Sequence, residues 1–155
     1  MRIGIISDTH GLLREEVKEL LRGCDAIFHA GDVCELYILQ ELEEIAPVYA
    51  ARGNNDWSLM NILPWKNIFE LEGKKIMITH IKEGITEDWS QYDLIVYGHT
   101  HRYALDKKGI PSGSIPGAAA RACTAQSRWL WPSWMSRDFI LRNVRYRLIG
   151  VIKEN

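Results

Sequence analysis

The sequence predicts an α/β fold built on parallel strands, and three observations support this prediction. Short apolar runs typical of buried strands alternate with segments in which apolar residues recur at helical spacing. Glycine, a turn signal, follows several of these runs. Side chains that bind metals come directly after the same runs. The length of 155 residues suits a single domain over residues 1–155.

The first third of the chain alternates strands with helices. Apolar runs predict strands over residues 3–6, 26–30 and 48–51. Helical periodicity predicts helices over residues 15–21 and 35–45, with Gly23 as a cap of the first helix. This order of elements implies a parallel βαβαβ unit.

The pattern changes after this unit. Residues 69–80 are typical of a hairpin that turns at Gly73, and residues 83–89 of a short helix or loop. A further strand is predicted over residues 93–97. The sequence then continues as a strand to residue 106, followed by a turn at Lys108–Gly109.

Composition excludes several classes of protein. A net charge of −1 gives no general attraction to nucleic acid or to a membrane surface. No apolar run approaches the roughly 18 residues of a membrane span, and no signal peptide is evident. Three cysteines without CxxC spacing indicate free thiols in a reducing compartment. We therefore expect a cytoplasmic protein without a membrane partner.

Metal-binding side chains cluster at the predicted strand ends. Asp8 and His10 lie two residues apart and so point the same way on an extended backbone. Gly31 and Gly53 let the backbone turn tightly before Asp32 and before Asn54. Four of the five histidines follow strands; His29, inside a strand, is expected to be a hydrogen-bonded core residue. The expected metal ligands are Asp8, His10, Asp32, Asn54, His80, His99 and His101.

This set of ligands is too large for one catalytic zinc ion, which takes three protein ligands and a water. It fits two metal ions roughly 3.5–4 Å apart that share a carboxylate, clamp a phosphate and lower the pKa of a bridging water. Imidazole and carboxylate together suit transition metals better than calcium or magnesium. We expect two divalent ions, with manganese first and nickel, cobalt, iron or zinc as alternatives.

The series Asp-x-His, Gly-Asp, Gly-Asn, His and Gly-His-x-His, over residues 1 to about 110, resembles the calcineurin-like metallophosphoesterase superfamily. The strings ISDTHG, HAGDV and YGHTH are similar to its small prokaryotic phosphodiesterase branch. The resemblance implies two mixed β-sheets packed as a sandwich and flanked by helices. It also implies one metal held by Asp8, His10, Asp32 and His101. Asp32 would bridge to a second metal, held also by Asn54, His80 and His99.

The resemblance further implies hydrolysis of a small phosphodiester by a metal-bridging hydroxide. The residues expected to act in catalysis are Asp32, Asn54, Asn55 and His99. Many members carry a histidine at the position of Asn55, which can protonate the leaving group. Asparagine cannot act as a general acid, so either substrates with good leaving groups are favoured or water protonates the leaving oxygen.

The tail, residues 111–155, departs from the family. Members usually have an Asn-Pro-Gly-Ser loop and two further strands, but residues 118–136 show no alternating pattern. Reading the codons for residues 114–140 one base earlier permits that loop, so we hypothesise a reading-frame slip near Pro111. Missing strands would then leave an edge of the second sheet exposed. The alternative is a divergent basic, aromatic tail that binds a partner.

Two other functions are open from the sequence. One is a non-catalytic, protein-binding scaffold, as in the retromer subunit that shares this fold, although no ligand position is lost here. The other is a nuclease, for which the tail offers seven basic against two acidic side chains. Because extra DNA-gripping domains are absent from this sequence, we do not expect nucleic acid as a partner. Trp57, Trp65 and Trp89 are expected in the core, with stacking on a base as the alternative; association between copies is open.

Overall fold

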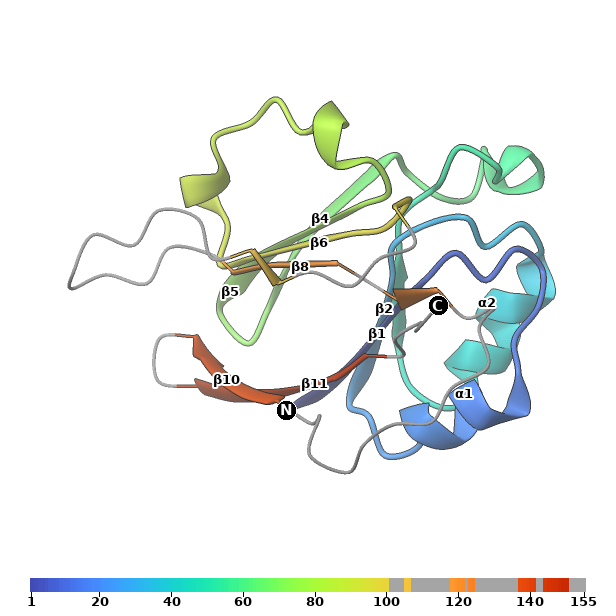
Figure 1. Ribbon diagram of the computed structural model, residues 1–155, viewed down its shortest axis with the longest axis horizontal. Coiled ribbons are helices and arrows are strands. Elements are labelled where there is room, and N and C mark those ends of the chain that lie inside the picture. Colours follow the sequence, from blue (N-terminus) through green and yellow to red (C-terminus); the bar gives the residue numbers. More distant parts are fainter. Residues whose placement is uncertain (101–104, 107–117, 122, 125–136, 142–143, 151–155) are drawn as a thin grey trace.

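Two β-sheets pack face to face, and two helices cover the outer face of the first sheet (Figure 1). The computed structural model describes residues 1–100, 105–106, 118–121, 123–124, 137–141 and 144–150. Both sheets contain parallel and antiparallel neighbours. The expected α/β fold, a sandwich of two mixed sheets flanked by helices, is therefore confirmed. No helix in these described ranges is long and apolar enough to cross a membrane.

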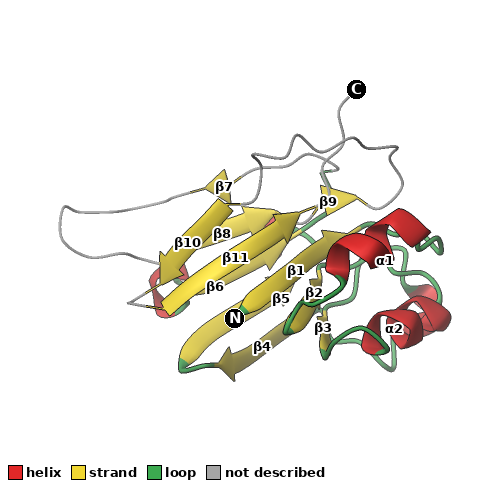
Figure 2. Cartoon of the chain, turned by 90° about the horizontal axis from the view of Figure 1, so that it is seen from below, coloured by secondary structure: helices red, strands yellow, loops and turns green. Residues whose placement is uncertain are grey.

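The first sheet contains the βαβαβ unit. Its strand order is β10 (Arg137–Leu141), β11 (Val144–Gly150), β1 (Arg2–Ser7), β2 (Ala26–His29) and β3 (Val48–Ala50), and β9 (Cys123–Thr124) also pairs with β1. β1, β2 and β3 are parallel, as predicted. The connecting helices α1 (Glu15–Leu21) and α2 (Leu36–Glu43) lie on the same side of these strands (Figure 2). Gly23 follows α1 with a φ of 73°, as its predicted capping role requires.

The second sheet has the order β4 (Lys66–Leu71), β5 (Lys74–Thr79), β6 (Leu94–Tyr97), β8 (Ala118–Arg121) and β7 (Leu105–Asp106). β4 and β5 form the predicted hairpin, which turns at Gly73 but begins earlier than expected. Short 3₁₀-helices span Trp57–Leu59, Lys82–Gly84 and Trp89–Gln91. The start of the predicted strand near residue 102 and the turn at 108–109 lie outside the described residues.

β1 and β2 of the first sheet are buried on both faces. Ile3 and Ile5 pack against Ile76 and Ile78 of the second sheet, whereas Ile6 packs toward the helices. A strand buried on both faces has no solvent side, which explains its continuous apolar sequence. The carboxyl ends of these strands then remain as the place where polar side chains can gather.

Within the described residues, the tail forms strands in both sheets. β8 pairs with β6, and β11 pairs with β1 in parallel register. Residues 144–148 alternate Val, Arg, Tyr, Arg and Leu, a strand pattern that lies beyond the stretch without alternation. Pro111, where we placed the reading-frame slip, lies outside the described residues.

Candidate metal centre

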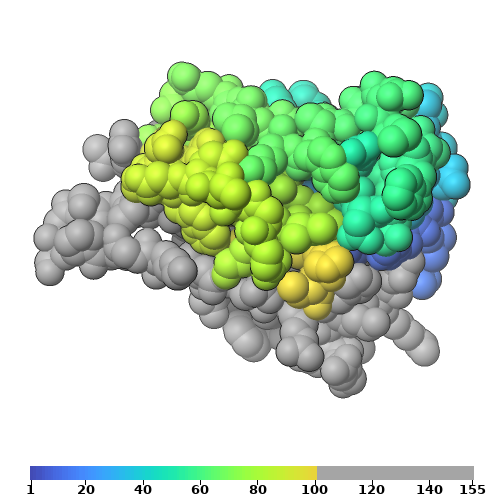
Figure 3. All heavy atoms as spheres, turned by 90° about the horizontal axis from the view of Figure 1, so that it is seen from above, coloured from blue at the N-terminus to red at the C-terminus, as the bar shows by residue number. Residues whose placement is uncertain are grey.

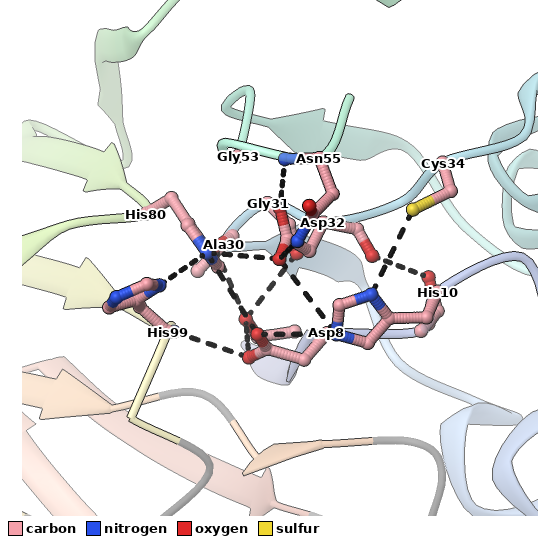
Figure 4. Close-up of polar contacts among 12 residues, drawn as sticks. Asp8, His10, Ala30, Gly31, Asp32, Cys34, Gly53, Asn55, His80 and His99 are labelled. Atoms are coloured by element: carbon pink, nitrogen blue, oxygen red, sulfur yellow. Dashed lines mark hydrogen bonds and ion pairs between the residues drawn. The ribbon is translucent and has the colours of Figure 1, made fainter. Parts of the chain in front are cut away.

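The loops that follow the strands are joined to one another by backbone hydrogen bonds. After β1 and β2, the amide of Asp8 donates to Gly31 O (2.9 Å) and that of His10 donates to Asp32 O (2.9 Å). After β5 and β6, the amide of Gly98 donates to His80 O (3.1 Å). These bonds bring side chains from both sheets to one site (Figure 4).

Two carboxylates and two imidazoles converge there. His80 Nε2 lies 3.4 Å from Asp32 Oδ2 and 3.9 Å from Asp8 Oδ1. His10 Nε2 approaches the same two oxygens, at 3.8 and 3.9 Å. The ligand atoms of Asp8, Asp32 and His80 lie within 4.8 Å of one another, and all three residues are buried. Buried carboxylates and imidazoles gathered this closely form a candidate metal-binding site.

The orientation of His80 is fixed by a carbonyl group behind it. His80 Nδ1 donates to Ala30 O (2.7 Å), which leaves Nε2 facing the carboxylates. Such a bond to the outer nitrogen is the usual way in which a metal-binding histidine is held. His99 joins from the next loop: its Nδ1 lies 3.3 Å from His80 Nε2, and its amide donates to Asp8 Oδ2.

Asn54 and Asn55 contribute in different ways. The buried Oδ1 of Asn54 has no hydrogen-bond partner among the described residues, as expected for an oxygen that ligates an ion. Asn55 holds Asp32 through two bonds, from its backbone N–H to Oδ1 (2.9 Å) and from its side-chain Nδ2 to Oδ2 (2.7 Å). Figure 4 shows Asn55 reaching down to Asp32 from above.

The hydrogen bond between Asp32 and His80 favours the charged form of each side chain. Burial acts to raise the pKa of Asp32, but hydrogen bonds from His80 and Asn55 outweigh it and hold that pKa well below its usual value. Burial likewise acts to lower the pKa of His80, but hydrogen bonds to Asp32 and Ala30 raise it overall. Asp32 is therefore an anion at neutral pH, as a metal-bridging carboxylate must be.

Backbone strain is concentrated at this site. Asp8, His10, Asp32 and His99 all have positive φ, between 46° and 72°. Each such non-glycine residue costs about 1–2 kcal/mol. Strain of this kind persists where the surrounding structure enforces it, and it is typical of functional sites.

Two glycines allow the loops to touch. A Cβ on Gly53 would lie 2.1 Å from Asp32 Oδ1, and a Cβ on Gly98 would lie 2.0 Å from Ser7 Oγ. The tight turn predicted at Gly31 is present, with a φ of 88°, but Gly53 does not have positive φ. Gly53 is required for close approach to Asp32 rather than for a turn.

Sequence reasoning missed Asp56, which is 1% exposed. Its Oδ1 accepts from the amide of Cys34 (2.6 Å) and its Oδ2 from the amide of Gly53 (2.7 Å). Asp56 thus joins the loop that carries Asp32 to the loop that carries Asn54. The feature of the sequence that could have identified Asp56 is its position directly after Asn54 and Asn55.

The remaining site predictions have mixed outcomes. His29 is fully buried and hydrogen-bonded to Thr9 Oγ1 (3.1 Å), so the core interpretation is confirmed. Trp89 packs on the cluster around Met77, but Trp57 and Trp65 are exposed, and their core assignment was wrong. His101 lies outside the described residues.

Known proteins share this sequence pattern. A family model for the calcineurin-like phosphoesterase superfamily domain matches residues 1–130. A phosphodiesterase from Methanocaldococcus jannaschii is 30% identical, over 69% of this chain and 77% of the relative. A protein named a probable metallophosphoesterase, from Methanothermobacter thermautotrophicus, is 34% identical over 66% and 67%.

Solved structures share the fold. A predicted phosphoesterase from Streptococcus pneumoniae is 28% identical, with a TM-score of 0.58 over 78% of this chain and 71% of the other. Vacuolar protein sorting 29 from Cryptosporidium parvum has a TM-score of 0.62 over 79% and 74%, at 20% identity. The chain therefore belongs to the calcineurin-like phosphoesterase superfamily.

Proposed function

We propose that the protein is a phosphodiesterase that hydrolyses small phosphodiesters with two divalent metal ions, manganese first among them. The observation that best supports this proposal is the convergence of side chains from both sheets: Nε2 of His10 and of His80 each lies 3.4–3.9 Å from the carboxylate oxygens of Asp8 and Asp32.

The donor set fits such ions. Asp8, His10 and Asp32 would hold one metal together with His101, and Asp32, Asn54, His80 and His99 would hold the other. When bound, the two ions supply positive charge to the phosphate and lower the pKa of a water between them. Asp32, held as an anion by its hydrogen bonds, would bridge the two sites.

The chain's own residues determine the geometry of the reaction. Asn55 fixes both oxygens of Asp32, and Ala30 O fixes the ring of His80. Because Asn55 Nδ2 already donates to Asp32 and has no acidic proton, Asn55 cannot protonate a leaving alcohol. The departing oxygen must take its proton from water, which favours leaving groups that are stable as anions.

The test is hydrolysis of bis-p-nitrophenyl phosphate by EDTA-stripped protein, with and without added Mn²⁺. Activity that returns with the metal and is absent in Asp32→Asn supports the proposal. Folded protein that stays inactive with Mn²⁺, Ni²⁺, Co²⁺ and Zn²⁺ contradicts it and favours the scaffold alternative.

A further inference from the structure

We propose that a pocket beside Asn54 holds an aromatic ester group of the substrate, so that the protein selects nucleotide-like phosphodiesters over simple alkyl ones. This inference rests on the function proposed above and concerns the same site. Its evidence is independent of the metal ligands, because it comes from the residues on either side of Asn54.

The pocket is small and adjoins the metal centre. Its volume is about 60 Å³, and its lining includes Arg52, Asn54, Trp57, Met60 and Trp65. Asn54 is also an expected metal ligand, so a group seated in the pocket lies next to the place where the phosphate would bind. A volume of this size receives the edge of one flat ring, while the rest of the ring lies across the neighbouring side chains.

Those neighbouring side chains are large, apolar and exposed. Trp57 is 75% exposed, Trp65 is 53% exposed and Met60 is 49% exposed. All three come from the segment that follows the Gly53-Asn54 turn. Figure 3 shows this green segment, around residue 60, on an open face of the molecule beside the gold residues near 100. Exposed aromatic side chains grouped at a pocket are typical of a binding surface.

The position of Arg52 indicates which kind of aromatic ligand the pocket would bind. Its Cζ lies 4.0 Å from the centroid of the Trp65 ring, so the guanidinium covers one ring face and leaves the rest of Trp65 for a ligand. Arg52 itself lines the pocket, so its guanidinium, which carries only hydrogen-bond donors, favours an acceptor on the ligand.

A nucleobase offers both features. It has a flat face that stacks on tryptophan, and it has carbonyl oxygens or ring nitrogens at its edge that accept from arginine. A methyl or other small alkyl ester has neither. Trp65 and Arg52 are therefore inferred to set specificity without taking part in the cleavage step.

The experiment compares two diesters that share one leaving group, thymidine 5′-(p-nitrophenyl phosphate) and methyl p-nitrophenyl phosphate, with Mn²⁺ present. The ratio of their kcat/KM values is measured for the wild type, Trp65→Leu and Arg52→Met. Ile62→Ala is the matched control, because Ile62 is 54% exposed on the same segment but does not line the pocket. A second measurement, by calorimetry, gives the Kd of thymidine 5′-monophosphate and of methyl phosphate for each protein.

We expect Trp65→Leu to lower the ratio about tenfold or more, the effect of losing one base–aromatic stack. Its Kd for thymidine monophosphate should rise by a similar factor, with methyl phosphate unchanged and the control like the wild type. Hydrolysis of both diesters with an unaltered ratio overturns the pocket while leaving the proposed function intact. If neither diester is hydrolysed but the Kd for thymidine monophosphate still depends on Trp65, the proposed phosphodiesterase function is overturned and the nucleotide-binding role of the pocket is supported.

Discussion

Asn55 donates two hydrogen bonds to the carboxylate of Asp32, one to each oxygen. The family resemblance implies that Asn55 stands where many members carry a histidine. In this chain the residue therefore orients the carboxylate expected to bridge the metals, and it supplies no proton. The fixed position of Asp32 and the lack of an acidic side-chain proton at position 55 have the same cause.

Replacing Asn55 with histidine separates these two roles. For the wild type we expect the rate to fall steeply as the pKa of the leaving phenol rises, because Asn55 has no acidic proton to give it. In Asn55→His the rate should depend less steeply on the pKa of the leaving phenol. The rate on p-nitrophenyl esters should fall about tenfold, because the variant loses hydrogen bonding to Asp32. The measurement is a series of aryl methyl phosphates. Equal slopes for the two proteins would show that Asn55 does not determine leaving-group preference.

Asp56 should be essential for stability although it ligates nothing. Asp56→Ala leaves the buried amides of Cys34 and Gly53 without an acceptor, at about 1–3 kcal/mol each. We expect the free energy of unfolding of metal-free protein, measured in urea, to fall by about 2–6 kcal/mol. Asp88→Ala is the control: Asp88 is an exposed cap of a short 3₁₀-helix, and its loss should cost no more than about 1 kcal/mol. Similar losses in the two variants would refute the joining role of Asp56.

His29 should make the protein sensitive to acid. Burial, and then the charge of nearby His80, lower the pKa of His29 from 6.5 to about 3. The unfolded chain therefore takes up this proton more readily, so stability is lost as the pH falls below about 6.5. The loss is about 1.4 kcal/mol per pH unit from this group. In EDTA-treated protein, His29→Gln should reduce the difference in unfolding free energy between pH 7 and pH 5. An unchanged difference would mean that His29 is charged in the fold.

The reading-frame hypothesis has its own test in the coding DNA around codon 111. A single-base change that restores an Asn-Pro-Gly-Ser loop in the downstream frame is the expected result. An uninterrupted native frame would leave the divergent tail as the explanation. In that case the native tail itself supplies β8 and β11, which pair with β6 and β1.

Much of the fold was readable from the sequence because its periodicities are strong. The runs that became β1 and β2 are buried on both faces, and the α1 pattern gave its bounds correctly. The strands of the tail could not be assigned from the sequence because β8 is formed by three alanines and an arginine, which carry little strand pattern. Its pairing depends on β6, which lies far away in the sequence.

The site could be located from the sequence, but the hydrogen bonds that hold its loops together could not be predicted. Asp8, Asp32 and His80 stand out because polar residues follow apolar runs. The hydrogen bonds that Asp56 receives connect Cys34 and Gly53, which are far apart in the chain. The exposure of Trp57 and Trp65 depends on how one irregular segment lies over the sheets, and no periodicity describes that.

The most direct test of the two-metal site is a titration of metal-free protein with Mn²⁺, in which hydrolysis of bis-p-nitrophenyl phosphate is followed against equivalents of metal added per chain. The site described here predicts little activity up to one equivalent and a rise that levels off at two. Full activity at one equivalent, or none at any number of equivalents in folded protein, would contradict it.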